Sequence, residues 1–237
     1  KVILIGNQEE ISKIAQENKI NINGIEVIDP NKSEKSQYFA KELFELRKAK
    51  GMTEEKAKEL VLDPVYFGMM MLKLGEADGL VSGAIHSTSD TLRPALQILK
   101  TAPGTKLVSA FFVMVVPDCE YGEKGTFIFA DSGLNEQPDA EALSEIAISS
   151  SESFKQLVNA EPKVAMLSYS TYGSAHSQAT EKMIEATKIT KEKKPDLLVD
   201  GELKLDAAII PEVAQFKAKE SPLKGKANVL IFPNLDA

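Results

Sequence analysis

The segment Val164-Ala-Met-Leu-Ser-Tyr-Ser-Thr-Tyr-Gly-Ser-Ala175 contains the pattern that decides the fold. Its apolar residues 164–167 predict a buried strand, which leads through a turn of hydroxyl side chains into an expected helix at residues 174–190. A second strand is expected at residues 197–199. This order of strand, helix and strand predicts two parallel strands with the helix packed on one face of the sheet.

The same alternation extends along the whole chain, so we predict the α/β fold class. The other strands are expected at residues 2–5, 25–28, 79–81, 106–115, 126–130 and 227–232. The other helices are expected at residues 9–17, 35–48, 54–62, 65–74, 88–99, 140–157 and 206–217. Only a short connection joins the strands at 106–115 and 126–130, which favours an antiparallel hairpin. We place a domain boundary near residues 101–104, so that residues 1–103 form a first α/β domain and residues 104–237 form a second.

A candidate anion site lies in Asp78-Gly-Leu-Val-Ser-Gly-Ala-Ile-His-Ser-Thr-Ser-Asp-Thr-Leu-Arg-Pro-Ala-Leu-Gln97. Here the expected strand at 79–81 and the flexible Gly83 lead to a helix start rich in hydroxyl groups, including Ser87 and Ser89, with Arg93 about one turn into the helix. Unpaired N–H groups at a helix N-terminus, together with a guanidinium, suit a phosphate or carboxylate ligand. An ordinary capped helix with a solvated arginine explains the stretch equally well.

The turn after residue 167 is a second candidate for phosphate binding, because ligands gather at the carboxyl ends of strands in open α/β sheets. The hydroxyl donors would be Ser168, Ser170, Thr171 and Ser174, and Gly173 would allow close backbone approach. A turn of this kind more often serves only to cap the following helix.

Two further groups have simpler explanations. Asp200, Glu202 and Asp206 follow a strand, but no histidine is near them in sequence, so a metal site is not favoured. Arg47 lies near the end of an expected helix that is followed by Gly51, where a basic residue complements the helix dipole without any ligand.

Composition restricts the classes of partner. The 237 residues are 43% hydrophobic and 27% charged, with a net charge of −7, which argues against broad nucleic-acid binding or binding to an anionic membrane surface. The longest apolar run, around residues 107–116, is too short to cross a bilayer. The single cysteine excludes an intrachain disulfide, and a reducing cytoplasm is the simplest compartment.

Five motifs in order closely resemble the phosphotransacetylase (phosphate acetyltransferase) family, the acetyl/butyryl phosphate transferases. They are residues 78–97, Phe-Ala-Asp-Ser-Gly at 129–133, residues 162–175, Asp-Gly-Glu-Leu-Lys-Leu-Asp-Ala-Ala at 200–208 and residues 225–233. The resemblance implies two three-layer α/β domains of the isocitrate/isopropylmalate dehydrogenase type that face each other across a cleft, in a homodimer. It also implies reversible transfer of an acetyl group between acetyl phosphate and coenzyme A, by direct thiolate attack in a ternary complex.

The resemblance assigns roles to particular residues. Arg47 and Arg93 occupy positions where the family carries active-site arginines, so both become candidate catalytic residues. The expected substrate-binding residues are Ser87, Ser89, Ser168, Ser170, Thr171, Gly173 and Ser174. Coenzyme A or acetyl-CoA, acetyl phosphate and inorganic phosphate are the implied ligands; no metal and no cofactor is required, since coenzyme A is a substrate.

The chain begins inside an expected strand and ends just after another, where an α/β protein would continue into a helix, which suggests truncation at both ends. The family continues into a C-terminal segment with an aspartate, a serine and an arginine implicated in thiol activation and phosphate binding. We therefore expect the printed chain to lack that segment and to be a poor catalyst. Two alternative functions stay open: a phosphate butyryltransferase, and a non-catalytic acetyl-CoA-sensing module of a malic enzyme.

Overall fold

The chain forms two units, Lys1–Thr101 and Ala102–Ala237, here called unit 1 and unit 2. The structure is a computed structural model and describes all 237 residues. We expected the domain boundary after residue 103, and the division between the units falls after Thr101. None of the helices has the length and apolar character that crossing a lipid bilayer requires.

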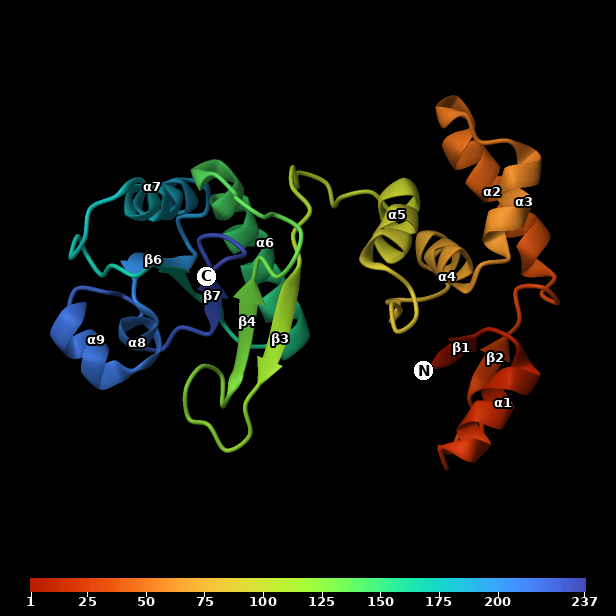
Figure 1. The fold of residues 1–237 in the computed structure, drawn as a ribbon, viewed down its shortest axis with the longest axis horizontal. Helices are drawn as coiled ribbons and strands as arrows, with labels where there is room; N and C mark the ends of the chain where they lie inside the picture. The colour runs from red at the N-terminus through yellow and green to blue at the C-terminus, as the bar shows by residue number, and fades with distance from the viewer. The chain divides into compact units, whose positions relative to one another are not determined.

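Unit 1 is mainly helical around one small parallel pair of strands, β1 and β2 (Figure 1). Four of its five α-helices begin at a side chain that accepts backbone N–H hydrogen bonds, namely Asn7, Thr53, Asp63 and Ser87, as capping requires. Its core contains the fully buried Phe39, Leu43, Phe67 and Met70. The elements are β1 (Ile3–Ile5), α1 (Gln8–Glu17), β2 (Glu26–Ile28), α2 (Lys35–Arg47), the 3-10 turn η1 (Lys48–Lys50), α3 (Glu54–Val61), α4 (Pro64–Lys73) and α5 (Thr88–Ile98).

Unit 2 is built on a five-stranded sheet with the strand order β3-β4-β7-β5-β6. The first pair, β3 and β4, is the expected antiparallel hairpin, and the remaining neighbours are all parallel. The elements are β3 (Phe111–Val115), β4 (Thr126–Ala130), α6 (Ala140–Val158), β5 (Lys163–Leu167), α7 (Gln178–Lys193), β6 (Leu198–Leu203), α8 (Leu205–Ile209), α9 (Pro211–Lys217) and β7 (Val229–Ile231).

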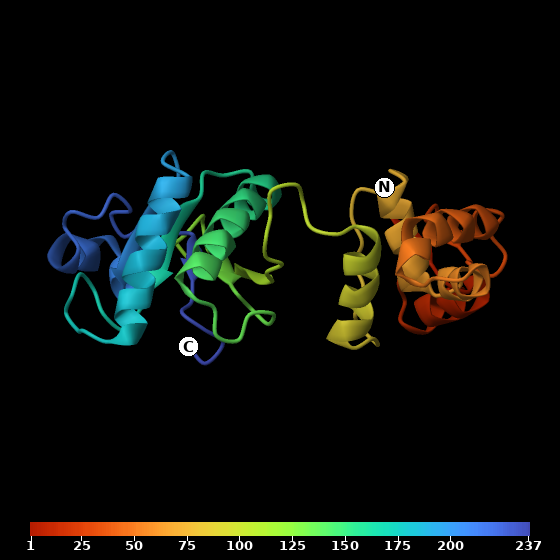
Figure 2. The same cartoon turned by 90° about the horizontal axis from the view of Figure 1, so that it is seen from above.

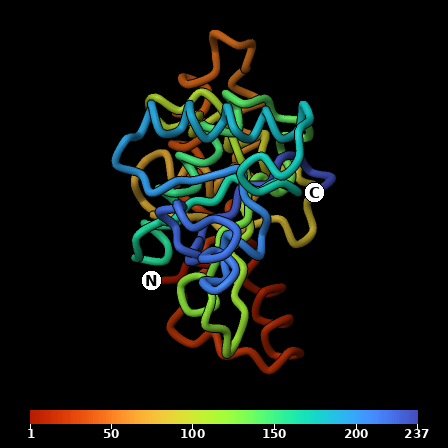
Figure 3. Tube along the Cα trace, turned by 90° about the vertical axis from the view of Figure 1, so that its left-hand side faces the viewer, coloured from red at the N-terminus to blue at the C-terminus, as the bar shows by residue number.

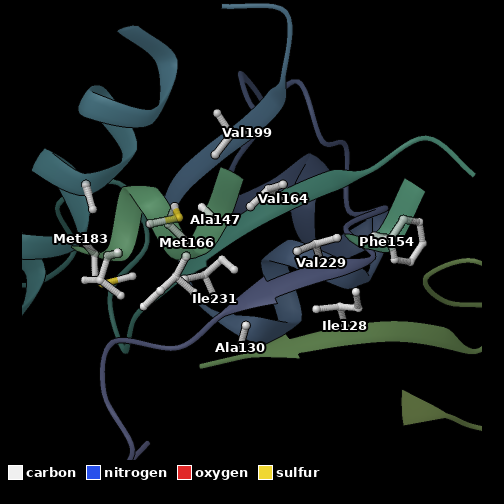
Figure 4. Packing of buried hydrophobic residues seen from close by; sticks show 13 residues of the cluster. Ile128, Ala130, Ala147, Phe154, Val164, Met166, Met183, Val199, Val229 and Ile231 are labelled. Carbon is white, nitrogen blue, oxygen red and sulfur yellow. The ribbon is translucent and has the colours of Figure 1, made fainter. Parts of the chain in front are cut away.

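Helices cover both faces of this sheet, because successive strand residues point to opposite sides. Val164 and Met166 of β5 pack with Phe154 of α6 and Met183 of α7, whereas Ala165 faces the side of α8 (Figure 4). Helices α6 and α7 lie side by side, as Figure 2 shows, and α8 and α9 lie on the other side of the strands from α7 (Figure 3). Unit 2 is therefore a three-layer α/β structure in which helices cover both faces of the parallel strands, while the side chains of the edge strand β3 are mostly exposed.

The structure corrects several expected boundaries. Residues 79–81 form no strand: only Leu80 packs against the core of unit 1, while Val81 is 99% exposed, so the segment lacks the burial expected of a buried strand. The expected helix at 206–217 is two helices, since Ile210 before Pro211 has an extended backbone. The helix expected from residue 174 begins at Gln178, where Ser177 and Thr180 form a capping box. The strand expected from residue 106 begins at Phe111.

The turn that follows β4 is held by one carboxylate, that of Asp131. Its Oδ1 accepts hydrogen bonds from the backbone N–H groups of Gly133 and Leu134 at 2.7 and 2.8 Å, and its Oδ2 accepts from Ala110 N and Asn135 Nδ2. Burial by itself raises the pKa of Asp131, but the four hydrogen bonds outweigh it and hold the pKa below its ordinary value. The ionised carboxylate is thus part of the folded structure.

Asp131→Asn tests this role through its pH dependence. Because the pKa of Asp131 is lower in the folded state, its stabilising contribution is present above the ordinary value of 3.8 and is lost as the pH falls through the folded value. We expect the variant to lose about 1 to 3 kcal/mol of unfolding free energy at about pH 7 and much less at about pH 3. Urea unfolding at both pH values measures the difference. The exposed Asp196→Asn is the control, and an equal deficit of Asp131→Asn at both pH values would contradict the assignment.

Truncation of Phe154 tests the packing between α6 and the sheet. Its side chain is fully buried, so Phe154→Ala should lower the unfolding free energy by about 3 to 5 kcal/mol. Phe216 is 93% exposed, and Phe216→Ala should change the unfolding free energy by less than about 0.5 kcal/mol. Chemical denaturation of the two variants provides the comparison, and similar losses in both would show that the core is assigned wrongly.

Candidate active site

The chain contains two arginines, Arg47 and Arg93, and both belong to unit 1. Arg93 lies on α5, and its side chain is 59% exposed. The nearest carboxylate oxygen is Asp90 Oδ1, 3.8 Å from its Nη1. An exposed pair at that distance stabilises little, so most of the interaction capacity of the guanidinium remains free for a ligand.

Arg47 is the last residue of α2 and is half-buried. Its Nε is buried and has no hydrogen-bond partner. A buried donor without an acceptor costs free energy, and most buried donors in folded proteins are paired. An anionic acceptor would satisfy this donor, whereas a purely dipole-complementing arginine would leave its side chain in solvent.

The serines at the start of α5 take part in capping. Ser87 Oγ accepts from the backbone N–H of Asp90 at 3.2 Å and donates to Asp90 Oδ2 at 2.6 Å, while Ser89 Oγ lies 2.9 Å from Ser87 Oγ. Both serines are exposed, and the Asp90 carboxylate already supplies negative charge at this helix N-terminus. The structure thus shows the capping role, and substrate binding by Ser87 and Ser89 stays a prediction.

In unit 2, the expected phosphate-binding turn lies at the carboxyl ends of the parallel strands, as predicted. Two of its hydroxyl residues are turned inward: Ser170 is fully buried and Thr171 is 7% exposed. Ser170 Oγ lies 3.2 Å from Ser174 Oγ, and Thr171 Oγ1 accepts from the backbone N–H of Lys204 at 2.9 Å. These hydroxyls hold the turn against β6, so a direct contact of Ser170 or Thr171 with substrate would require the turn to move.

The other three residues of this turn are more accessible. Ser174 is exposed, and Ser168 and Gly173 are half-buried. Gly173 has a φ of +77°, a left-handed conformation that favours glycine. Contact of these three residues with substrate stays a prediction, and in this conformation of the turn only their exposed atoms could make it.

Two buried acids on β6 fix this turn, a role that the sequence pattern did not reveal. Glu202 is 2% exposed, and its Oε1 accepts from Ser170 Oγ and from the backbone N–H of Gly173, both at 2.8 Å. Asp200 is 4% exposed and accepts from Tyr172 Oη and from Lys191 Nζ, the latter at 3.0 Å. Partial burial and the bond to Asp200 raise the pKa of Tyr172, so it remains a protonated donor.

The spacing of these acids is a signal that could have indicated this role. Asp200 and Glu202 stand two positions apart directly after the strand expected at residues 197–199, and a continuation of that strand would place both carboxylates on one face of the sheet. Gly201 between them allows close strand packing, since a Cβ there would lie 2.6 Å from Met166 Cβ. Asp206 instead pairs with Lys217 Nζ at 2.7 Å, and no three acid, histidine or cysteine side chains come together as metal ligands.

Comparison with known proteins places these residues in a family. The family model described as "Phosphate acetyl/butaryl transferase" matches residues 1–237. The chain is 64% identical over 237 residues to a phosphate acetyltransferase of Acetivibrio thermocellus, covering all of this chain and 71% of that relative. It is 46% identical over 235 residues to a phosphate acetyltransferase of Escherichia coli, covering 99% of this chain and 32% of the relative.

A solved structure agrees with this placement. The EutD phosphotransacetylase from Staphylococcus aureus superimposes with a TM-score of 0.86 at 42% identity, over 99% of this chain and 70% of that chain. The family model and the curated relatives both extend over essentially the whole sequence. The chain therefore belongs to the phosphate acetyl/butyryl transferase family.

Proposed function

We propose that the protein transfers an acetyl group reversibly between acetyl phosphate and coenzyme A, giving acetyl-CoA and inorganic phosphate in one direction. The observation that carries this proposal beyond family membership is the state of the two arginines. Arg47 has a buried donor without a partner, and Arg93 has only a loose carboxylate neighbour. Arginine binds a phosphoryl anion with charge-assisted hydrogen bonds; Arg93 is exposed to such a ligand, and the Arg47 side chain would have to turn for its buried Nε to reach one.

The reaction requires positive charge at a defined place. The thiolate of coenzyme A attacks the acetyl carbon, a C–S bond forms, the C–O bond to the phosphoryl group breaks, and phosphate leaves with the electron pair. Negative charge therefore moves from sulfur to the carbonyl oxygen and then to phosphate. Fixed guanidinium groups stabilise that charge and offset the repulsion between two polyanionic substrates.

We assign Arg47 and Arg93 of unit 1 to one phosphoryl group, and contact of Ser168, Gly173 and Ser174 of unit 2 with a substrate stays a separate prediction. This scheme uses no metal or prosthetic group, and coenzyme A enters as a substrate. The dehydrogenase-like arrangement of two domains about a cleft, the homodimer and the cytoplasmic location stay predictions from the resemblance.

Arginine variants of the full-length protein test the proposal. Arg93→Ala and Arg47→Ala should each lower kcat/KM for acetyl phosphate by about 10- to 100-fold, because each removes charge-assisted hydrogen bonds worth about 1.5 to 3 kcal/mol. Coenzyme A-dependent formation of acetyl-CoA is the assay. Lys48→Ala is the matched control, since Lys48 follows Arg47 in sequence but is exposed and paired with Glu45 at 2.5 Å.

The same assay separates the proposal from its alternatives. Full activity of either arginine variant would remove that residue from the site. A higher kcat/KM for butyryl phosphate than for acetyl phosphate in the unaltered protein would indicate a phosphate butyryltransferase. Binding of acetyl-CoA without turnover would indicate a sensing module.

A further inference from the structure

Tyr66 lies on the same face of unit 1 as Arg93. Its hydroxyl, on α4, donates a hydrogen bond to Gln97 Oε1 on α5 at 3.2 Å. Gln97 is four residues after Arg93, and side chains at that spacing are neighbours on one helix face. Helices α4 and α5 pack directly against each other (Figure 1). The phenol oxygen of Tyr66 is therefore placed next to the row of side chains that includes Arg93.

The second arginine also acts on this phenol. Helix α2, which ends at Arg47, packs against both α4 and α5. Partial burial and the negative charge of Asp63 raise the pKa of Tyr66, while the positive charges of Arg93, Lys56 and, least of these, Arg47 oppose that rise. The hydroxyl thus stays protonated at neutral pH and lies within the field of both guanidinium groups.

The hydroxyl of Tyr66 could donate a hydrogen bond to a bound anion. Its present acceptor, the amide oxygen of Gln97, is neutral and its bond of 3.2 Å is long for an O–H donor. A phosphoryl oxygen carries negative charge and is a stronger acceptor. A hydroxyl can turn to a new acceptor by rotation about one bond, without movement of either helix.

We propose that Tyr66 is a further binding residue of the arginine site, where its hydroxyl donates to an oxygen of the phosphoryl group held by Arg47 and Arg93, and that Gln97 is the acceptor which this hydroxyl leaves when the anion binds. The proposal rests on the proposed function for the identity of the anion. The phosphoryl group belongs either to acetyl phosphate or to coenzyme A, and the two substrates are distinguished by their separate KM values.

The opposing explanation is that the Tyr66–Gln97 bond only joins α4 to α5. Tyr66→Phe distinguishes the binding role from this structural role, because it keeps the ring and its packing and removes only the hydroxyl. The matched control is Tyr38→Phe on α2, whose side chain is exposed and lies in the same unit. A structural tie would change the melting temperature of Tyr66→Phe without a selective change in substrate kinetics.

The experiment measures kcat, KM for each substrate, the inhibition constant of inorganic phosphate and the melting temperature of the full-length protein. For Tyr66→Phe we expect about a tenfold rise in KM for acetyl phosphate and in the inhibition constant of phosphate, as for loss of a hydrogen bond to a charged group. Tyr38→Phe should match the unaltered protein. A tenfold rise confined to KM for coenzyme A supports the proposal with that substrate as the source of the phosphoryl group.

Gln97→Leu supplies a second readout. Because Gln97 Oε1 and the anion compete for the one phenolic proton, Gln97→Leu should lower KM for the same substrate in the unaltered protein and add nothing in the Tyr66→Phe background. Unchanged KM values and an unchanged phosphate inhibition constant in Tyr66→Phe would overturn the proposal, as would equal effects of Gln97→Leu in both backgrounds.

Failure of the proposed function would be recognised separately. If the unaltered full-length protein forms no acetyl-CoA, that function is wrong, and calorimetric titration with inorganic phosphate then decides the inference. Phosphate affinity about tenfold weaker in Tyr66→Phe than in the unaltered protein supports it. Equal affinity, or no phosphate binding to either protein, overturns it.

Discussion

The parallel pairing of β4, β7, β5 and β6 is the constraint on which the structure of unit 2 depends. Parallel strands need helical connections, so both faces of the sheet are covered and its strands are buried. The same pairing brings the carboxyl ends of four strands to one edge. The turn after β4, held by Asp131, and the turn after β5, held by Glu202, therefore lie at a common edge.

Most of the polar groups described at this edge form hydrogen bonds with one another. Glu202 and Asp200 accept hydrogen bonds from the turn after β5, and Ser170 and Thr171 point inward to complete the network. Such a network fixes a loop in one conformation because each buried group depends on the others for its hydrogen bonds. Unit 1 differs, because its two arginines are left without tightly bound carboxylates. In unit 2 the polar groups at the strand ends are hydrogen-bonded to one another, whereas in unit 1 the two arginines have no tightly bound carboxylate.

Much of this fold could be predicted from the sequence, because the strands of unit 2 are short apolar runs between recognisable helix starts. The strand expected at residues 79–81 was wrong, since an apolar run does not reveal which of its side chains the fold buries, and Val81 is exposed. The break before Pro211 has a local signal in the sequence, because the residue before a proline disfavours the helical conformation. The contacts of Glu202 with Ser170 and Gly173 join residues about 30 positions apart. The spacing of the acids could indicate a shared face of the sheet, but no local pattern could identify these partners. The candidate site residues Arg47 and Arg93 come from the family resemblance, and the structure adds that Arg47 Nε has no hydrogen-bond partner and that the carboxylate nearest to Arg93 is 3.8 Å away.

The central claim is that Arg47 and Arg93 bind one phosphoryl group, and a double-mutant cycle tests it most directly. The measurement is the affinity for inorganic phosphate, by calorimetry, of the unaltered full-length protein, Arg47→Ala, Arg93→Ala and the double variant. Two residues that bind the same phosphoryl group are coupled. The loss of binding free energy in the double variant should therefore differ from the sum of the two single losses by about 0.5 kcal/mol or more. Strictly additive losses, or phosphate affinity unchanged in either single variant, would contradict the account.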